Sequence, residues 1–175
     1  MKNLFKIIVL FSIFFLPLET KLFASDVYFV DYSKVMNQST AGKKAQDNLK
    51  KLLNNSNKKF NETAKKLKDE ENNIISQRNA LSKEEYKKKA DALRKKVFEL
   101  NKEREKSIRE VATKRKKAGD EMLKNLNPIL GKYMRENNIS VVIDKKHVLM
   151  GDKKFEITSQ IIEILNKEFK SINLN

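Results

Sequence analysis

The residue types that most often carry catalysis are scarce in this chain of 175 residues. There is no cysteine, and His147 is the single histidine. The lack of cysteine removes thiolate nucleophiles, disulfides and Cys-ligated metals. Asp26, Asp31 and Asp144 flank two segments expected to be strands, but their spacing fits no metal-ligand pattern. We interpret these aspartates as turn formers and caps, and His147 as a structural or exposed residue. No catalytic, cofactor or metal site is predicted, and there is no nucleotide-binding loop.

The chemistry that the sequence offers is cationic. There are 38 basic residues against 23 acidic ones, a net charge of +15. Lysine pairs recur at 43–44, 50–51, 58–59 and 65–66, steps that keep them on one face of a helix. Residues 43–71 carry a net charge of +4, and residues 83–124 carry +7. We expect this surface to attract an acidic partner. The alternative is a face that is merely solvated.

The first 24 residues have the layout of a secretory signal peptide. Lys2 and Lys6 precede an uncharged apolar run over 7–18, and the small residue Ala24 follows shortly afterwards. A retained membrane anchor is the alternative, but a spanning helix needs about 20 apolar residues. We therefore predict cleavage near Ala24 and an exported, soluble product. Its net charge would be +13, because removal leaves 35 basic and 22 acidic residues.

The middle of the chain has the pattern of two long helices. No Gly or Pro occurs between Lys43 and Ala118, and apolar residues recur at steps of three and four. The stripe loses its phase after Ile75, where Ser82 and Glu85 form a capping box that announces a new helix. We predict a hairpin with its turn near 76–82, a first helix capped by Thr40, and a second helix over 83–136. A single unbroken rod is the alternative.

Short elements flank the hairpin. Residues 26–31 and 139–144 are β-branched and short enough to be strands, residues 147–151 are expected to be a third strand, and residues 33–37 one helical turn. Thr158 is expected to cap a last helix, and Pro128 to kink the second arm helix near its junction with the body. The predicted fold class is α+β. It has a signal peptide over 1–24, a β/α oligomerisation body over 25–40 and 125–175, and a basic arm over 41–124.

The ordered set of motifs resembles the Skp/OmpH family of periplasmic chaperones. The matching pieces are VYFVDYSKVMNQSTAGKKAQDNL from residue 27, the ALSKEEY turn from residue 80, and NISVVIDKKHVLMGDKKFEITSQIIEILN from residue 138. The resemblance covers nearly all of residues 26–169. It implies a homotrimer with a small β body and three projecting arms, which holds unfolded outer-membrane proteins without ATP and keeps them soluble for membrane insertion.

The resemblance also gives the candidate residues their roles. Electrostatic client binding on the arm is expected of Lys50, Lys51, Lys58, Lys59, Lys65, Lys66, Lys87, Lys88, Lys95 and Lys96. Apolar client binding, or the core of the arm itself, is expected of Leu52, Phe60, Leu67, Ile74, Tyr86, Leu93, Val97 and Leu100. The oligomer body is expected to use Val27, Phe29, Val141, Ile143, Val148 and Met150.

Two other functions fit the composition. The first is a basic coiled-coil protein that binds anionic surfaces such as lipopolysaccharide, phospholipid or nucleic acid, whose contacts would be salt-sensitive. Few aromatic residues on the arm could stack on bases, namely Phe60, Tyr86 and Phe98. The second is a passive coiled-coil spacer, which crosslinking that yields only dimers would favour.

Overall fold

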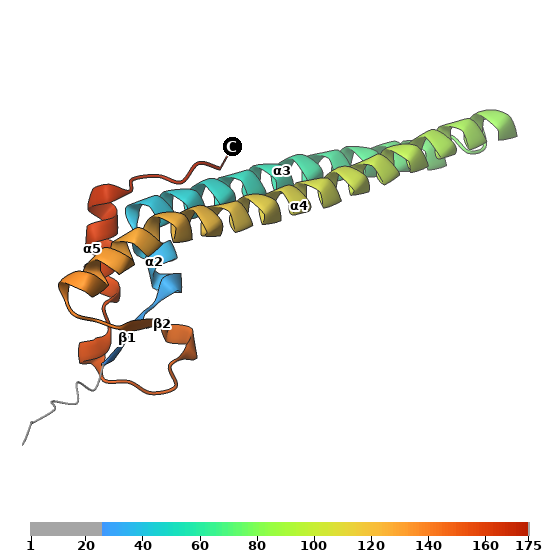
Figure 1. Ribbon diagram of the computed structural model, residues 1–175. Coiled ribbons are helices and arrows are strands. Elements are labelled where there is room, and N and C mark those ends of the chain that lie inside the picture. Colours follow the sequence, from blue (N-terminus) through green and yellow to red (C-terminus); the bar gives the residue numbers. More distant parts are fainter. Residues whose placement is uncertain (1–25, 175) are drawn as a thin grey trace, which may run out of the picture.

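A long helical hairpin projects from a small body (Figure 1). The computed structural model describes residues 26–174, so the predicted signal peptide lies outside the described residues. The elements follow the order β1, α2, α3, α4, β2, two 3-10 turns and α5. Within residues 26–174, no helix is both long enough and apolar enough to cross a membrane.

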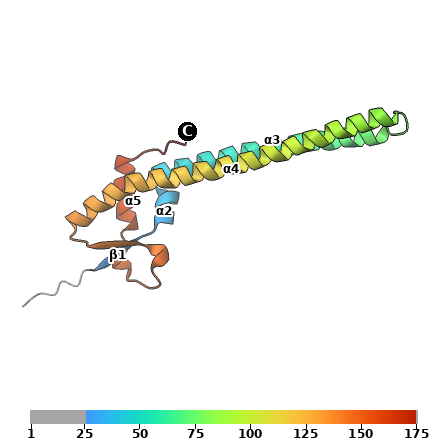
Figure 2. The ribbon, with the colours of Figure 1, turned by 45° about the vertical axis from the view of Figure 1, so that its right-hand side comes forward.

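The hairpin consists of α3 (Thr40–Ser76) and α4 (Lys83–Glu136), which run side by side over most of their length (Figure 2). The capping box is present: Ser82 Oγ accepts a hydrogen bond from the Glu85 backbone, and the Glu85 carboxylate accepts one from the Ser82 backbone. These bonds satisfy backbone donors that a new helix leaves unpaired, so the chain reverses here. The predicted hairpin, its turn and the bounds of the second helix are confirmed, and the unbroken rod is wrong.

The N-cap of α3 lies one residue before the predicted cap. Ser39, rather than Thr40, is the N-cap, and its side chain accepts a hydrogen bond from the Gly42 backbone at 3.1 Å. The short helix α2 (Tyr32–Gln38) ends directly against this site. A Cβ at position 42 would lie 2.2 Å from the Met36 carbonyl oxygen, so only glycine permits this close approach. The cap is therefore fixed by the tight α2–α3 corner.

Two short parallel strands form the sheet of the body. β1 (Val27–Val30) pairs with β2 (Val141–Asp144) in a register that places Val27 opposite Val141. A parallel pair needs a crossover connection, which here is the whole hairpin. Val30 packs into the core, whereas Val27 and Val141 lie on the opposite, exposed face. Both predicted strands are confirmed, each shorter than expected.

The third strand predicted over 147–151 is wrong. A 3-10 turn over Lys145–His147 replaces its start, because the Asp144 side chain accepts a hydrogen bond from the Lys146 backbone. Asp152 caps a second 3-10 turn over Lys153–Phe155 in the same way. The chain therefore bends twice, and its only pairing with β1 here is a bridge between Phe29 and Glu156 among the described residues.

The last helix, α5 (Thr158–Glu168), closes the core. Its N-cap is Ile157, not the predicted Thr158, because the Thr158 hydroxyl is used elsewhere: it accepts a hydrogen bond from the Asp31 backbone at 2.9 Å. Asp31 itself caps α2 through the Lys34 backbone, as predicted for this aspartate. The buried cluster joins both roots of the hairpin to α2, β1 and α5 through Val30, Val35, Ala41, Ala45, Ala118, Met122, Leu126, Ile129, Ile157, Ile161, Leu165 and Ile172.

The body end of α4 continues through Pro128 to Glu136. A kink is expected at Pro128 because proline lacks the N–H that would bond to the carbonyl four residues back. This kink stays a prediction. Asn137 is the C-cap of α4, so the helix ends where predicted. The next residue, Asn138, adopts a φ of 54°, a conformation that asparagine tolerates better than most residues. This reversal leads the chain directly into β2. The predicted division of the chain into a body over 25–40 and 125–175 and an arm over 41–124 also stays a prediction.

Candidate functional site

The predicted apolar stripes of the arm meet between α3 and α4. Phe60, Ile74 and Leu93 are buried, with 6%, 7% and 9% of their surface exposed. Leu52, Leu67, Tyr86 and Leu100 are half-buried. Val97 is the exception, since 40% of its surface is exposed. Seven of the eight stripe residues are therefore covered to a large extent by the hairpin itself.

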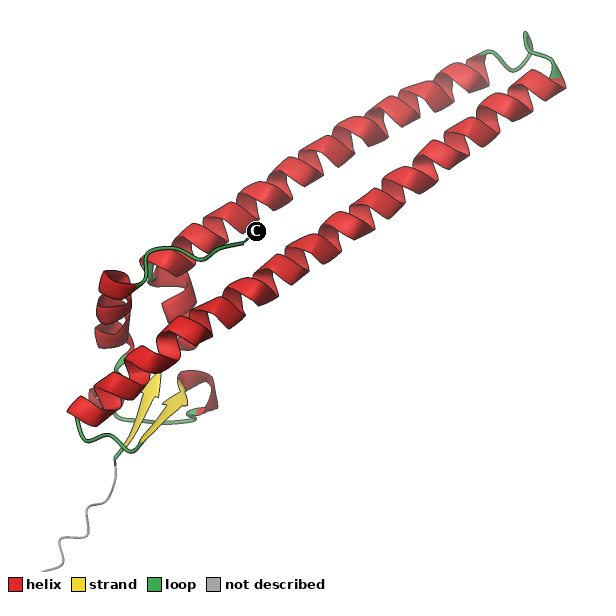
Figure 3. Ribbon diagram, turned by 45° about the horizontal axis from the view of Figure 1, so that its top comes forward, coloured by secondary structure: helices red, strands yellow, loops and turns green. Residues whose placement is uncertain are grey.

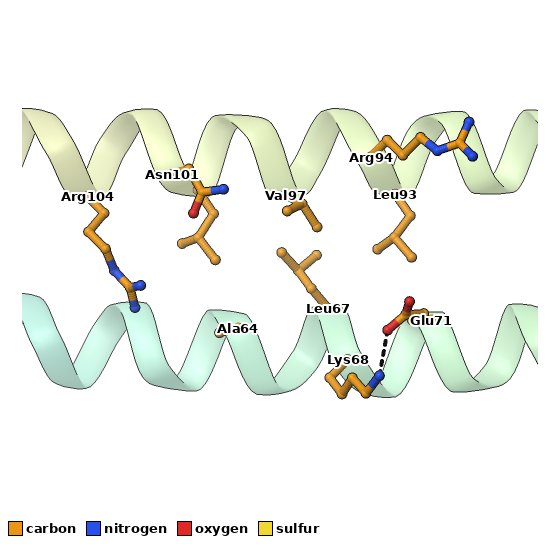
Figure 4. Close-up of a pocket in the computed structure, with 10 residues that line it drawn as sticks. Ala64, Leu67, Lys68, Glu71, Leu93, Arg94, Val97, Asn101 and Arg104 are labelled. Atoms are coloured by element: carbon orange, nitrogen blue, oxygen red, sulfur yellow. Dashed lines mark hydrogen bonds and ion pairs between the residues drawn. The ribbon is translucent and has the colours of Figure 1, made fainter.

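The seam between the helices is incompletely filled midway along the arm. A groove of about 490 Å³ is lined by Leu67, Leu93, Val97 and Leu100, with Arg94 and Arg104 among the residues at its edges (Figure 4). A second groove of about 510 Å³ also borders Leu67 and Leu100, together with Lys95 and Lys96. These two leucines are thus reachable from both sides of the hairpin. Apolar floors beside cationic side chains suit an extended, amphipathic ligand.

Polar contacts hold the two arm helices in register. Lys96 donates to both carboxylate oxygens of Glu70 across the hairpin, at 2.7 and 2.8 Å. Lys59 lies 3.8 Å from a carboxylate oxygen of Glu103. The Arg104 guanidinium lies 5.8 Å from the centre of the Phe60 ring, a cation–π distance. All of these groups except Phe60 are at least partly solvated, so each contributes little to stability alone.

The predicted lysines all lie on the surface of the arm. All ten are exposed. Only Lys59 and Lys96 form ion pairs within residues 26–174; the other eight have no acidic partner there. Those eight are Lys50, Lys51, Lys58, Lys65, Lys66, Lys87, Lys88 and Lys95. Their charge is available to a ligand without first breaking an internal pair.

Three further apolar residues of the arm, to which the sequence analysis assigned no role in client binding, are largely exposed. Phe98 is 65% exposed, Ile108 is 59% exposed and Ile75 is 54% exposed. A signal was present: Phe98 directly follows Val97, and Ile75 directly follows Ile74, so apolar residues come in adjacent pairs. Only one member of such a pair can face the neighbouring helix. The other member must then face solvent or a ligand.

The body exposes apolar surface on one side of its sheet. Val27, Val141 and Ile143 are 48%, 42% and 36% exposed. Phe29, from the same predicted set, is buried within the protomer, with its ring against the Gly151 backbone. In the loop that replaces the third strand, Val148 is half-buried and Met150 is 93% exposed.

A chain of polar contacts ties that loop to the body. Lys145 donates to the Glu156 carboxylate at 2.9 Å, and the Thr158 hydroxyl also donates to it. The Lys145 hydrogen bond lowers the pKa of Glu156, with a smaller effect from Thr158. Burial alone would raise the pKa of Asp144, but hydrogen bonds from Lys146 outweigh it and hold that pKa below its ordinary value.

No three His, Cys, Asp or Glu residues gather as a metal site among residues 26–174.

The arm and body geometry agrees with comparisons to known proteins. The family described as Outer membrane protein (OmpH-like) matches residues 26–165, which is most of the chain. The chain belongs to this OmpH-like family. No curated protein matches it. The fold of this OmpH-like chain is similar to a crystal structure of an OmpH-like protein from Caulobacter crescentus CB15, which is described as a candidate outer membrane chaperone.

That structural match has a TM-score of 0.76 at 18% sequence identity, and covers 84% of this chain and 87% of the Caulobacter chain. At this identity the likeness establishes the shared fold, a helical arm on a small strand-containing body. The OmpH-like match ends at residue 165, within α5. The segment that follows α5 therefore lies outside the part of the chain that the family match covers.

Proposed function

We propose that this OmpH-like protein is an ATP-independent holdase chaperone of the periplasm. It binds unfolded outer-membrane proteins between helical arms and keeps them soluble for membrane insertion. The observation that carries the proposal is the surface of the arm, which presents both unpaired lysines and exposed apolar side chains such as Phe98 and Ile108. Export of the chain, through cleavage of a signal peptide near Ala24, is part of the proposal.

The two kinds of arm residue would act at different stages. The lysines raise the rate of encounter with acidic clients, since electrostatic steering acts over distance. The exposed apolar residues then hold the client. Val97 and Ile108 are eleven residues apart, about three helical turns, so they share one face of α4. Of the predicted stripe residues, Val97, Leu67 and Leu100 can contribute from the grooves, while Phe60, Ile74 and Leu93 serve the core of the arm.

The proposed cage is a homotrimer joined through the body. A single copy leaves Val27, Val141 and Ile143 exposed on one sheet face, and Leu149 and Met150 are 103% and 93% exposed. Contiguous apolar surface of this kind marks an interaction site. The far edge of β2 also has no neighbouring strand among residues 26–174, so its backbone can pair with another copy. We assign the oligomer contacts to these residues and to Val148, whereas Phe29, on the same sheet face, is covered by the loop at Gly151.

Aggregation of an unfolded porin tests this function. The porin is diluted from urea with the mature protein in several-fold molar excess and without ATP, and light scattering is followed. Suppressed scattering is expected, and the substitution V141D, which places a charge on the sheet face, should reduce both trimer formation and suppression. Unchanged scattering in the presence of the mature protein would refute the proposal.

A second function is favoured by the eight lysines without acidic partners. Such a surface also binds phosphate groups of lipopolysaccharide or phospholipid headgroups, and the contacts weaken steeply with salt. Sedimentation with anionic vesicles at low and high salt separates the two functions. A chaperone held by apolar contacts keeps its client at high salt, whereas a surface binder loses its vesicles. No nucleotide is needed for either function.

A further inference from the structure

The segment after α5 runs back along the root of the hairpin. α5 ends at Glu168, Phe169 has an extended backbone, and residues 170–174 belong to no helix or strand and run as a drawn-out loop in Figure 3. Figure 3 shows this segment lying over the space between α3 and α4, and Figure 1 shows it on the same side of the arm. Ile172 is only 8% exposed and belongs to the buried cluster of the body, against which Leu174 also packs. A short extended peptide is therefore docked on the arm root.

The polar contacts of this segment are directed at its backbone. The Asn173 backbone N–H donates to both carboxylate oxygens of Glu121, each at 3.1 Å. The Lys114 ammonium donates to the Leu174 carbonyl at 2.7 Å. Both side chains come from α4, and neither of these bonds involves a side chain of the docked segment. Any extended peptide in the same place could make the same two contacts.

The apolar contacts select a pattern rather than a particular sequence. Ile172 and Leu174 face the hairpin, whereas Ser171 and Asn173 are exposed, which is the alternation of a β-strand. Ala41 and Ala45 of α3 and Ala118 of α4 belong to the same buried cluster as Ile172. Because alanines are small, they leave room in this cluster for the branched, buried side chain of Ile172. The root groove thus accepts an extended segment with apolar residues two apart.

We propose that this groove, defined by Ala45, Lys114, Ala118 and Glu121, is a binding site for extended segments with alternating apolar side chains. Residues 169–174 occupy it within the same chain. The external occupant is a strand-forming segment of an unfolded membrane β-barrel protein, since such strands alternate apolar and polar residues with a period of two. The identity of that external occupant rests on the proposed function, whereas the existence of the groove does not. The tail competes with the client and must leave before the client enters.

The test uses a chain that ends at Glu168 and a fluorescent peptide of sequence FKSINL, which copies residues 169–174. Fluorescence anisotropy should show the peptide binding to the shortened chain and binding about tenfold more weakly to the full chain. The difference arises because the attached tail has an effective concentration in the millimolar range. A control peptide with aspartate in place of the Ile172 and Leu174 equivalents should not bind. Equal binding of the first peptide to both chains would overturn the site.

Full-length variants keep the test valid should the shortened chain fail to fold. E121A and K114A each remove one backbone contact of the docked segment, so each should loosen that segment on the full chain. Faster hydrogen exchange at Asn173 is the direct readout: it should rise severalfold in E121A. The matched control is K116A, whose lysine pairs with Asp120 instead, and it should leave that exchange unchanged. Unchanged exchange in E121A would overturn the docking geometry.

Competition then identifies the external occupant. Unfolded porin should displace FKSINL from the shortened chain, and the full chain should bind porin less tightly than the shortened one. Should FKSINL bind as expected while porin fails to displace it, the groove stands and the client as its occupant is overturned. Should porin aggregation be suppressed without any displacement, the holdase function stands and the groove has no part in it.

Discussion

Replacing Phe98 by serine should weaken client binding without harming the fold. Phe98 lies in the N-terminal third of α4, with 65% of its surface exposed. A phenylalanine side chain can bury roughly 200 Å², so about 130 Å² is available to a client. At about 25 cal/mol per Å², complete coverage is worth about 3 kcal/mol. A mobile client that covers half of it would gain about 1.5 kcal/mol, roughly tenfold in Kd for each contact made.

The assay is the tryptophan fluorescence of an unfolded porin titrated with the mature protein. The chain contains no tryptophan, so the signal comes from the client alone. F98S should raise Kd by about tenfold, whereas F98L, which keeps an apolar side chain, should raise it by less than threefold. Thermal unfolding of both variants should match that of the parent protein, because the site is exposed. An unchanged Kd for F98S would refute the assignment of holding to exposed apolar residues.

Three further predictions concern the structure that presents the arm. S82A removes the cap at the tip and should cost about 1 kcal/mol, seen as faster hydrogen exchange over residues 83–86. M122A empties a fully buried position and should cost about 2–5 kcal/mol in urea denaturation, whereas L123A, at a position 42% exposed, should cost less than about 0.5 kcal/mol. The lowered pKa of Glu156 means that its contacts stabilise the fold at neutral pH and lose that effect as the pH falls through the pKa of the folded state. E156Q should therefore be less stable than the parent at pH 7, by under about 1 kcal/mol, and equally stable near pH 2–3.

The long helices could be predicted closely because their signals are local. A capping box located the turn and the start of α4, and the asparagines at 137 and 138 located its end. The cap of α3 was displaced by one residue because a tertiary corner, the contact of Gly42 with Met36, decides it. Thr158 likewise looks like a cap in sequence, but its hydroxyl serves Asp31, a residue 127 positions away. No local pattern contains that information.

The candidate site was only partly predictable, for two physical reasons. Helical periodicity located the seam of the arm, but it says nothing of apolar residues outside the stripe, so it gave Phe98 and Ile75 no role in holding a client. The third strand failed because Asp144 and Asp152 divert the backbone into 3-10 turns, although Val148 to Met150 have strand-like composition. The docked tail had no signal, since residues 169–174 are too short to show a period. The roles of the arm lysines and of the body residues stay predictions.

Native mass spectrometry of the mature protein tests the central claim most directly. Spectra are recorded alone and after addition of an unfolded outer-membrane protein, in buffer without ATP. We expect a trimer in the first spectrum and a complex of three copies with one client in the second. A monomer or dimer that acquires no client would contradict it.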